Sequence, residues 1–168
     1  PEGADVNAST FHSACVRILR RSAESIGISR SFTIYDTDDS VSIMKRILKE
    51  LNIDDKAFPP KTVLGYISRA KGDMLTAEKY SQEAERGYDP RKKVIARAYA
   101  EYDRRLRAAD ALDFDDLIFC TVRLLLEDED VRAYYQRFFK YVLVDEYQDT
   151  SNLQYLLAST LAGGYDNI

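Results

Sequence analysis

The sequence predicts a mostly α-helical protein in which a helical segment is inserted into part of an α/β domain. Apolar residues recur at helical spacing along most of the 168 residues. Residues 141–144 are instead continuously apolar and rich in β-branched and aromatic side chains, which is typical of a strand buried on both faces. The charge also changes: residues 1–109 hold 20 Lys/Arg and 16 Asp/Glu, whereas residues 110–168 hold 4 and 12. We therefore assign residues 1–29 and 110–168 to one α/β core and residues 30–109 to a helical insertion.

The expected helices of the first two thirds follow start and stop signals. The first begins after Ser9 and Thr10, two good N-cap residues, and ends at Gly27. The second is capped by Asp38 or Asp39 and carries a single apolar face. Three further helices, two of them opened by proline, are expected over residues 60–72, over residues 77–85 and from about residue 90 onward.

The last third is more apolar and more acidic. Asp113 caps a strongly apolar helix over residues 114–126, and Asp116 places a second carboxylate near the positive end of that helix. A further helix is expected over residues 131–139. It leads directly into the apolar run predicted to be a strand.

A single parallel strand needs neighbours, and this sequence supplies few of them. Residues 5–8 and 166–168 are the candidate strand beginnings that could flank residues 141–144. A last helix, capped by Thr150 or Ser151, follows the strand. The sequence therefore looks like part of a larger α/β core.

Composition excludes several classes of protein. Apolar residues make up 45% and charged residues 31%, so a disordered chain is not expected. The apolar runs are far shorter than the roughly 20 residues needed to cross a bilayer, so we expect no membrane partner. Cys15 and Cys120 lie far apart on apolar helix faces, which favours buried core thiols and a reducing, cytoplasmic compartment.

The sharpest chemical feature is the acidic pair Asp145–Glu146, directly after the predicted strand. Ligands of open α/β sheets bind outside the carboxyl ends of the strands. A carboxylate there can hold Mg²⁺, and a neighbouring carboxylate that faces the other way can act on a water molecule. The residues therefore indicate a metal ligand at Asp145 and a base at Glu146, with a solvated turn as the alternative.

Other polar clusters have simpler explanations. Asp113, Asp115 and Asp116 are explained by the cap and first turn of a helix rather than by a metal site. Tyr99 and Tyr102 lie on an apolar stripe and are expected in the core. Several basic side chains could meet DNA phosphates, although each is more simply a solvated charge: Lys71, Arg91, Lys92, Lys93, Arg97, Arg104 and Arg105.

Three blocks resemble the UvrD/Rep family of superfamily 1 DNA helicases. Residues 141–150 read YVLVDEYQDT and are similar to motif II of that family. Residues 10–13, TFHS, followed by CVRILR, resemble motif Ib, and LDFDDLI at residues 112–118 resembles a segment that precedes motif II. The blocks occur in the family's order, and the similarity covers essentially the whole chain.

The resemblance implies a role for each matching residue of the nucleotide site. It implies that Asp145 helps to hold the Mg²⁺ of MgATP and that Glu146 activates the hydrolytic water. Gln148 and Asp149 match the motif too, and we expect hydrogen bonds from them that link the nucleotide to neighbouring motifs. ATP and Mg²⁺ are thus the implied cofactors.

The resemblance also implies contacts with DNA. It assigns Thr10, His12 and Ser13 to contacts with single-stranded DNA, and we add Lys71 as a candidate contact with the phosphates of incoming DNA. The implied partners are single-stranded DNA, junctions between single and double strands, and the rest of a helicase chain. Residues 1–29 and 110–168 would then belong to a RecA-like domain 1A, and residues 30–109 to the helical subdomain 1B.

The implied function is ATP-dependent unwinding or translocation, 3′ to 5′ along single strands, in DNA repair or replication. No G-x-x-x-x-G-K-[ST] loop, which holds ATP phosphates in this family, occurs in the sequence. We therefore expect an interior part of a longer helicase that is inactive by itself. The alternatives are a noncatalytic DNA- or protein-binding helical module, and a metal-dependent nuclease that uses Asp145, Glu146 and the Asp113 cluster.

Overall fold

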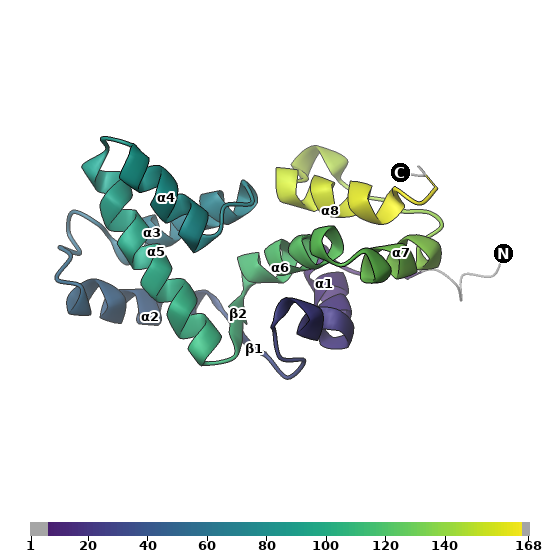
Figure 1. The fold of residues 1–168 in the computed structure, drawn as a ribbon, viewed down its shortest axis with the longest axis horizontal. Helices are drawn as coiled ribbons and strands as arrows, with labels where there is room; N and C mark the ends of the chain where they lie inside the picture. Colours follow the sequence, from purple (N-terminus) through teal and green to yellow (C-terminus); the bar gives the residue numbers. More distant parts are fainter. Residues whose placement is uncertain (1–6, 166–168) are drawn as a thin grey trace.

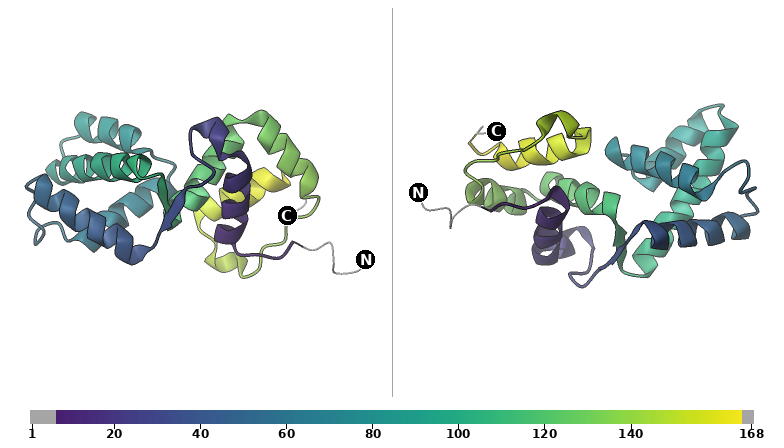
Figure 2. Two further views of the ribbon diagram at one scale, coloured as in Figure 1. Left: turned by 90° about the horizontal axis from the view of Figure 1, so that it is seen from below. Right: turned by 180° about the vertical axis from the view of Figure 1, so that it is seen from behind.

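The computed structural model describes residues 7–165 and shows two lobes joined by a two-stranded sheet (Figure 1). We call helices α2 to α5, within residues 37–108, the helical lobe, and α1 (residues 11–22) with α6 to α8, within residues 114–162, the motif lobe. Each lobe has its own hydrophobic cluster, and the two clusters share none of the buried residues in the described part of the chain. Two further views also show the lobes side by side with the strands between them (Figure 2). The protein is thus mostly helical with a small parallel sheet.

Helix α6 (Phe114–Glu127) forms the centre of the motif lobe. It packs against α1 (Phe11–Ser22), α7 (Glu129–Phe138) and α8 (Asn152–Ala162). Because α6 is surrounded, its buried residues occur on all sides, which explains its strongly apolar sequence. Cys15 of α1 and Cys120 of α6 are free thiols buried in this core, as predicted. Within residues 7–165, no helix combines the length and apolarity needed to span a membrane.

Three predicted caps, at Thr10, Asp113 and Ser151, are confirmed by hydrogen bonds from the backbone. Each of these side chains accepts the N–H of the residue three positions further on, which satisfies a donor at the start of a helix. The first helix continues from α1 into the 3₁₀ helix η2 (Ala23–Ile26) and ends where Gly27 adopts the left-handed conformation.

The helical lobe consists of α2 (Thr37–Glu50), α3 (Pro60–Gly72), α4 (Ala77–Arg86) and α5 (Pro90–Ala108). The predicted cap of α2 is wrong by two or three residues. Asp36 is the N-cap, and Asp39 closes a capping box by accepting the Asp36 N–H at 3.1 Å. Tyr99 and Tyr102 are 1% and 0% exposed, so they are core residues as predicted.

A short parallel sheet connects the lobes. Strand β1 (Thr33–Tyr35) pairs with β2 (Ala111–Asp113), with Ile34 opposite Leu112. These strands carry the chain into and out of the helical lobe. The sequence does not predict either strand, because three residues are too few to show a period.

The predicted buried strand at residues 141–144 is wrong for this structure. These residues form no strand, and the side chains of Tyr141 and Leu143 are 73% and 92% exposed. Val142 packs against the motif-lobe core, so burial alternates rather than covering both faces. The physical reason is the lack of a pairing strand within residues 7–165, because a strand is stable only when its backbone groups are paired. Of the expected neighbours, residues 5–6 and 166–168 lie outside the described part of the chain, and residues 7–8 form no strand.

Candidate functional site

The acidic pair Asp145–Glu146 lies in an exposed turn after the extended segment. The N–H of Glu146 donates to Asp145 Oδ1 at 2.9 Å, so one carboxylate orients the backbone of the other residue. Glu146 has φ 50° and ψ 43°, the left-handed conformation, which costs a residue with a Cβ about 1 kcal/mol. Backbone strain of this kind concentrates at functional sites, and both carboxylates remain open to solvent.

The next residues form the 3₁₀ helix η3 (Tyr147–Asp149). The N–H of Asp149 donates to the Glu146 carbonyl at 2.9 Å, and the Tyr147 ring meets the Tyr155 ring edge-on with 6.3 Å between centroids. The aromatic contact anchors this segment to α8. Gln148 and Asp149 are exposed here, which leaves their side chains accessible to a ligand.

Residues 10–13, predicted to contact DNA, surround the start of α1. Thr10 Oγ1 accepts the Ser13 N–H at 3.2 Å and donates to Ser13 Oγ at 3.0 Å, so both hydroxyls are held at the helix start. The imidazole of His12 meets the Phe114 ring edge-on, with 6.1 Å between centroids and 77° between planes. This contact joins the start of α1 to the start of α6.

One groove of about 430 Å³ brings the two predicted sites together. Thr10 and His12, at the start of α1, and Val144 and Asp145, at the end of the extended segment, all line it. Apolar side chains of α8, including Leu157, contribute to its wall. Residues that are far apart in the sequence therefore share one concave surface. Ser13, Glu146, Gln148 and Asp149 are not among its lining residues.

The predicted contact between Lys71 and DNA is wrong. Lys71 is 2% exposed, and its Nζ lies 2.9 Å from Asp113 Oδ2 and 2.7 Å from Asp116 Oδ1. Tyr102 donates its hydroxyl hydrogen to Asp113 Oδ2 at 2.9 Å, and the Ser40 hydroxyl lies 2.9 Å from the Tyr102 oxygen. A DNA phosphate cannot reach an ammonium group enclosed in this way. We call these five side chains the junction network.

The acids of the junction network differ in pKa. Burial raises the pKa of Asp116 to about 7, although the Lys71 ammonium opposes this shift. Burial also acts to raise the pKa of Asp113, yet Lys71 and the hydrogen bonds to this carboxylate hold it below its ordinary value. Burial disfavours the charged form of Lys71, but Asp116 and Asp113 raise its pKa well above the ordinary value. The network therefore keeps a charged lysine and an ionised Asp113 in the interior.

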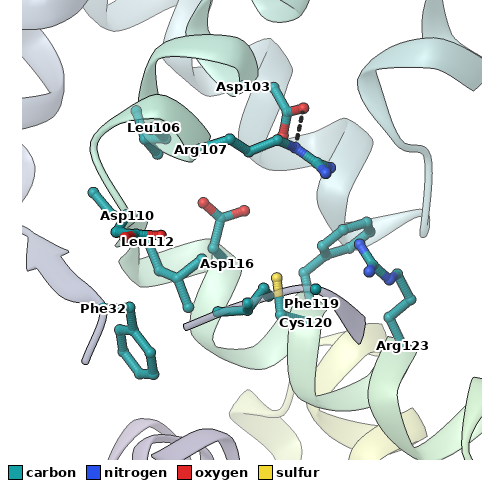
Figure 3. A pocket seen from close by; sticks show the side chains of 13 residues that line it. Phe32, Asp103, Leu106, Arg107, Asp110, Leu112, Asp116, Phe119, Cys120 and Arg123 are labelled. Atoms are coloured by element: carbon teal, nitrogen blue, oxygen red, sulfur yellow. Dashed lines mark hydrogen bonds and ion pairs between the residues drawn. The ribbon is translucent and has the colours of Figure 1, made fainter. Parts of the chain in front are cut away.

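A second cavity, of about 120 Å³, borders the junction network (Figure 3). The Asp116 carboxylate points toward it, and Arg107 pairs with Asp103 at 2.7 Å on the opposite side. Arg123 lines the same space and lies 3.2 Å from Glu127 through its Nε. Both arginines face carboxylates of their own, so we regard this cavity as the edge of the network rather than a separate binding site.

Other basic residues of the helical lobe also have acidic partners. Lys92 pairs with Glu83 at 2.9 Å, and Arg104 pairs with Glu101 at 2.8 Å. Arg105 contacts Glu101 at 2.7 Å and also pairs with Glu50. These pairs reduce the positive field that the sequence of α5 suggests.

Comparison with known proteins decides the family. The model of the UvrD/REP helicase N-terminal domain matches residues 2–168. The chain belongs to the UvrD/Rep helicase family. It is 46% identical over its full length to the ATP-dependent DNA helicase PcrA of Bacillus subtilis, and 42% identical over 98% of its length to that of Leuconostoc citreum. It is also 46% identical over 95% of its length to PcrA of Staphylococcus aureus. The chain spans 22% of the length of each of these relatives.

The UvrD/Rep chain has one exposed residue at the site that sequence analysis did not single out. Phe114 is the first residue of α6 and is 45% exposed beside His12. The available signal was its position directly after the Asp113 cap, where the first helical turn leaves a large aromatic side chain outside the core. An exposed ring next to an imidazole offers a surface on which a nucleobase can stack.

Proposed function

We propose that this chain carries part of the motor of an ATP-dependent DNA helicase that moves 3′ to 5′ along single-stranded DNA. The observation that carries the proposal is the shared groove, which Thr10, His12 and Asp145 all line. A motor needs its nucleotide site and its DNA site mechanically connected, and one concave surface lined by both segments suits that need. In this proposal residues 1–29 and 110–168 belong to the RecA-like domain 1A, and residues 30–109 to subdomain 1B.

The acidic turn would form the nucleotide side of the motor. The carboxylates of Asp145 and Glu146 are exposed oxygen donors, and this is the ligand chemistry that Mg²⁺ prefers. Bound Mg²⁺ would neutralise charge on the ATP phosphates. Asp145 would hold the metal directly or through water, and Glu146 would orient a water molecule and accept its proton. Gln148 and Asp149 would connect this turn to the nucleotide by hydrogen bonds.

The starts of α1 and α6 would form the DNA side. Thr10 and Ser13 offer hydroxyl groups to the sugar–phosphate backbone, which suits contacts that position a strand without reading its bases. Phe114 offers an exposed ring to the bases, and the half-buried ring of His12 lies beside it. Stacking of one base on an aromatic side chain contributes about 1–3 kcal/mol, so we expect Phe114→Ala to weaken single-strand binding about tenfold. Phe138→Ala removes a ring that is 56% exposed elsewhere on the motif lobe and serves as the matched control.

The first test of this function is ATP hydrolysis stimulated by single-stranded DNA. In the full-length protein, Glu146→Gln should lower turnover by about 10²- to 10⁴-fold while ATP binding is retained, because general base catalysis is lost. Glu129→Gln makes the same change at an exposed glutamate on α7, 3.5 Å from Arg132, and should leave turnover unchanged. The 168-residue chain alone, without a phosphate-binding loop, should hydrolyse ATP negligibly.

Two other outcomes would change the conclusion. Normal turnover of Glu146→Gln would remove the proposed base, and salt-sensitive DNA binding that persists without nucleotide would then favour the noncatalytic binding module. Unwinding of duplexes with a 5′ tail but not a 3′ tail would reverse the proposed direction. Cleavage of DNA in Mg²⁺ without ATP would favour the nuclease alternative.

A further inference from the structure

The junction network links elements of both lobes. Lys71 comes from α3 of the helical lobe, and Tyr102 and Ser40 come from α5 and α2 of the same lobe. Asp113 and Asp116 come from the end of β2 and the first turn of α6. The two hydrophobic clusters share none of the described buried residues, although Met74, directly after α3, packs against the motif-lobe cluster. The polar contacts of the network add a second, charged connection between the lobes.

The two oxygens of Asp113 have different partners. Oδ1 accepts the Asp116 N–H at 2.8 Å and so caps α6. Oδ2 accepts the Lys71 ammonium and the Tyr102 hydroxyl, each at 2.9 Å. One side chain therefore begins α6 and is at the same time held by the helical lobe.

Phe114 follows Asp113 directly in the sequence, and its ring meets His12. A chain of contacts thus runs from buried Lys71 to the surface proposed to bind single-stranded DNA. We propose that Lys71 is a positioning residue that holds the start of α6 so that Phe114 is presented to a base. This inference rests on the proposed function, and in it Lys71 acts without touching DNA.

The chemistry of the network explains why a lysine is needed. Without the cation, the carboxylates of Asp113 and Asp116 would be buried with only neutral hydrogen-bond donors, such as the Tyr102 hydroxyl. Each carboxylate would then protonate or turn toward solvent. A turn of Asp113 toward solvent breaks the cap of α6 and moves Phe114. A second contact between the same helices, from Ser68 of α3 to the Asp115 carboxylate, involves no buried cation and is not expected to replace it.

The test is a double-mutant cycle in the full-length protein, with affinity for a single-stranded oligonucleotide as the readout. Lys71→Met should weaken binding about fivefold and Phe114→Ala about tenfold. If Lys71 acts through Phe114, Lys71→Met added to Phe114→Ala should weaken binding by less than about twofold more. Ile67→Ala removes a buried residue one turn earlier in α3, so it should lower stability but leave affinity within about twofold of wild type.

The possible outcomes distinguish failure of the proposed DNA surface at Phe114 from failure of the proposed role of Lys71. Unchanged binding by Phe114→Ala overturns the proposed DNA surface and, with it, the role of Lys71. Weaker binding by Phe114→Ala together with unchanged binding by Lys71→Met overturns the role of Lys71 alone. Multiplicative effects in the double variant, or equal losses from Ile67→Ala and Lys71→Met, would show a general structural role instead.

A second variant covers the case in which Lys71→Met does not fold. Lys71→Met combined with Asp116→Asn keeps the formal charge of the network at its wild-type value and retains Asp113 as the cap. This variant should be more stable than Lys71→Met and should show the same fivefold loss of affinity, since α3 no longer holds Asp113. Wild-type affinity of this folded variant would contradict the proposal.

Discussion

Two acidic clusters of this protein have similar sequence settings and opposite environments. Asp113 and Asp116 follow a short extended segment, and so do Asp145 and Glu146. The first pair is buried, holds Lys71 and begins a helix, whereas the second pair is exposed and lies in a strained turn. The comparison shows that the neighbours of a carboxylate, rather than its place after a strand, determine whether it is available to a ligand.

The largest expected difference between the clusters is in stability. Lys71→Met should lower the free energy of opening of α3 and the first turn of α6 by about 3 kcal/mol, because it leaves buried carboxylates without a cation. Asp145→Asn, at an exposed turn, should change the free energy of opening by no more than about 0.5 kcal/mol. Hydrogen exchange in the full-length protein measures both, and equal effects would remove the distinction between the clusters.

The buried and exposed acidic clusters are also expected to differ in how they make the free energy of unfolding depend on pH. The pKa of Asp116 is about 7 in the folded protein, above its ordinary value of 3.8, so the folded state binds more protons than the unfolded state between these values. The stability contributed by Asp116 is therefore fully present below about pH 4 and declines as the pH rises toward 7. Between pH 5 and pH 7 the decline should be about 2 kcal/mol.

Thermal melting from pH 5 to pH 8 measures this decline. The difference between wild type and Asp116→Asn isolates the group, because the asparagine does not titrate. A difference that stays constant across the range would show that Asp116 is ionised throughout. Asp145→Asn is the control from the exposed cluster and should leave the pH profile of the wild type unchanged.

Helices and their caps could be predicted from the sequence because both signals are local. The apolar stripe of α2, with Met44, Ile47 and Leu48, needs only the helical period to be recognised. The place of Asp113 before an apolar run predicts that it caps α6. Its second role could not be predicted, because Lys71 lies 42 residues away in the sequence.

The position of Lys71 in the sequence nevertheless indicates that it is buried, although its charge alone suggests a solvated side chain. It follows Val63 and Ile67 at intervals of four residues, so it lies on the buried face of α3. A lysine on such a face requires buried acidic partners. The error at residues 141–144 has a different origin. The apolar pattern typical of a strand is present, but strand formation depends on pairing with another strand, which local residues cannot specify.

The smallest expected effect concerns the strained turn of the exposed cluster. Glu146→Gly should raise the stability of the protein by up to about 1 kcal/mol, because glycine adopts a φ of 50° without the Cβ penalty. Glu129→Gly, in the first turn of α7, should lower it by about 0.5–1 kcal/mol, because glycine there loses more conformational entropy. Chemical denaturation compares the two variants. A stability gain with loss of ATP hydrolysis would mean that the protein keeps a strained glutamate at this turn for its chemistry, whereas a stability loss would mean that the left-handed turn is not strained in solution.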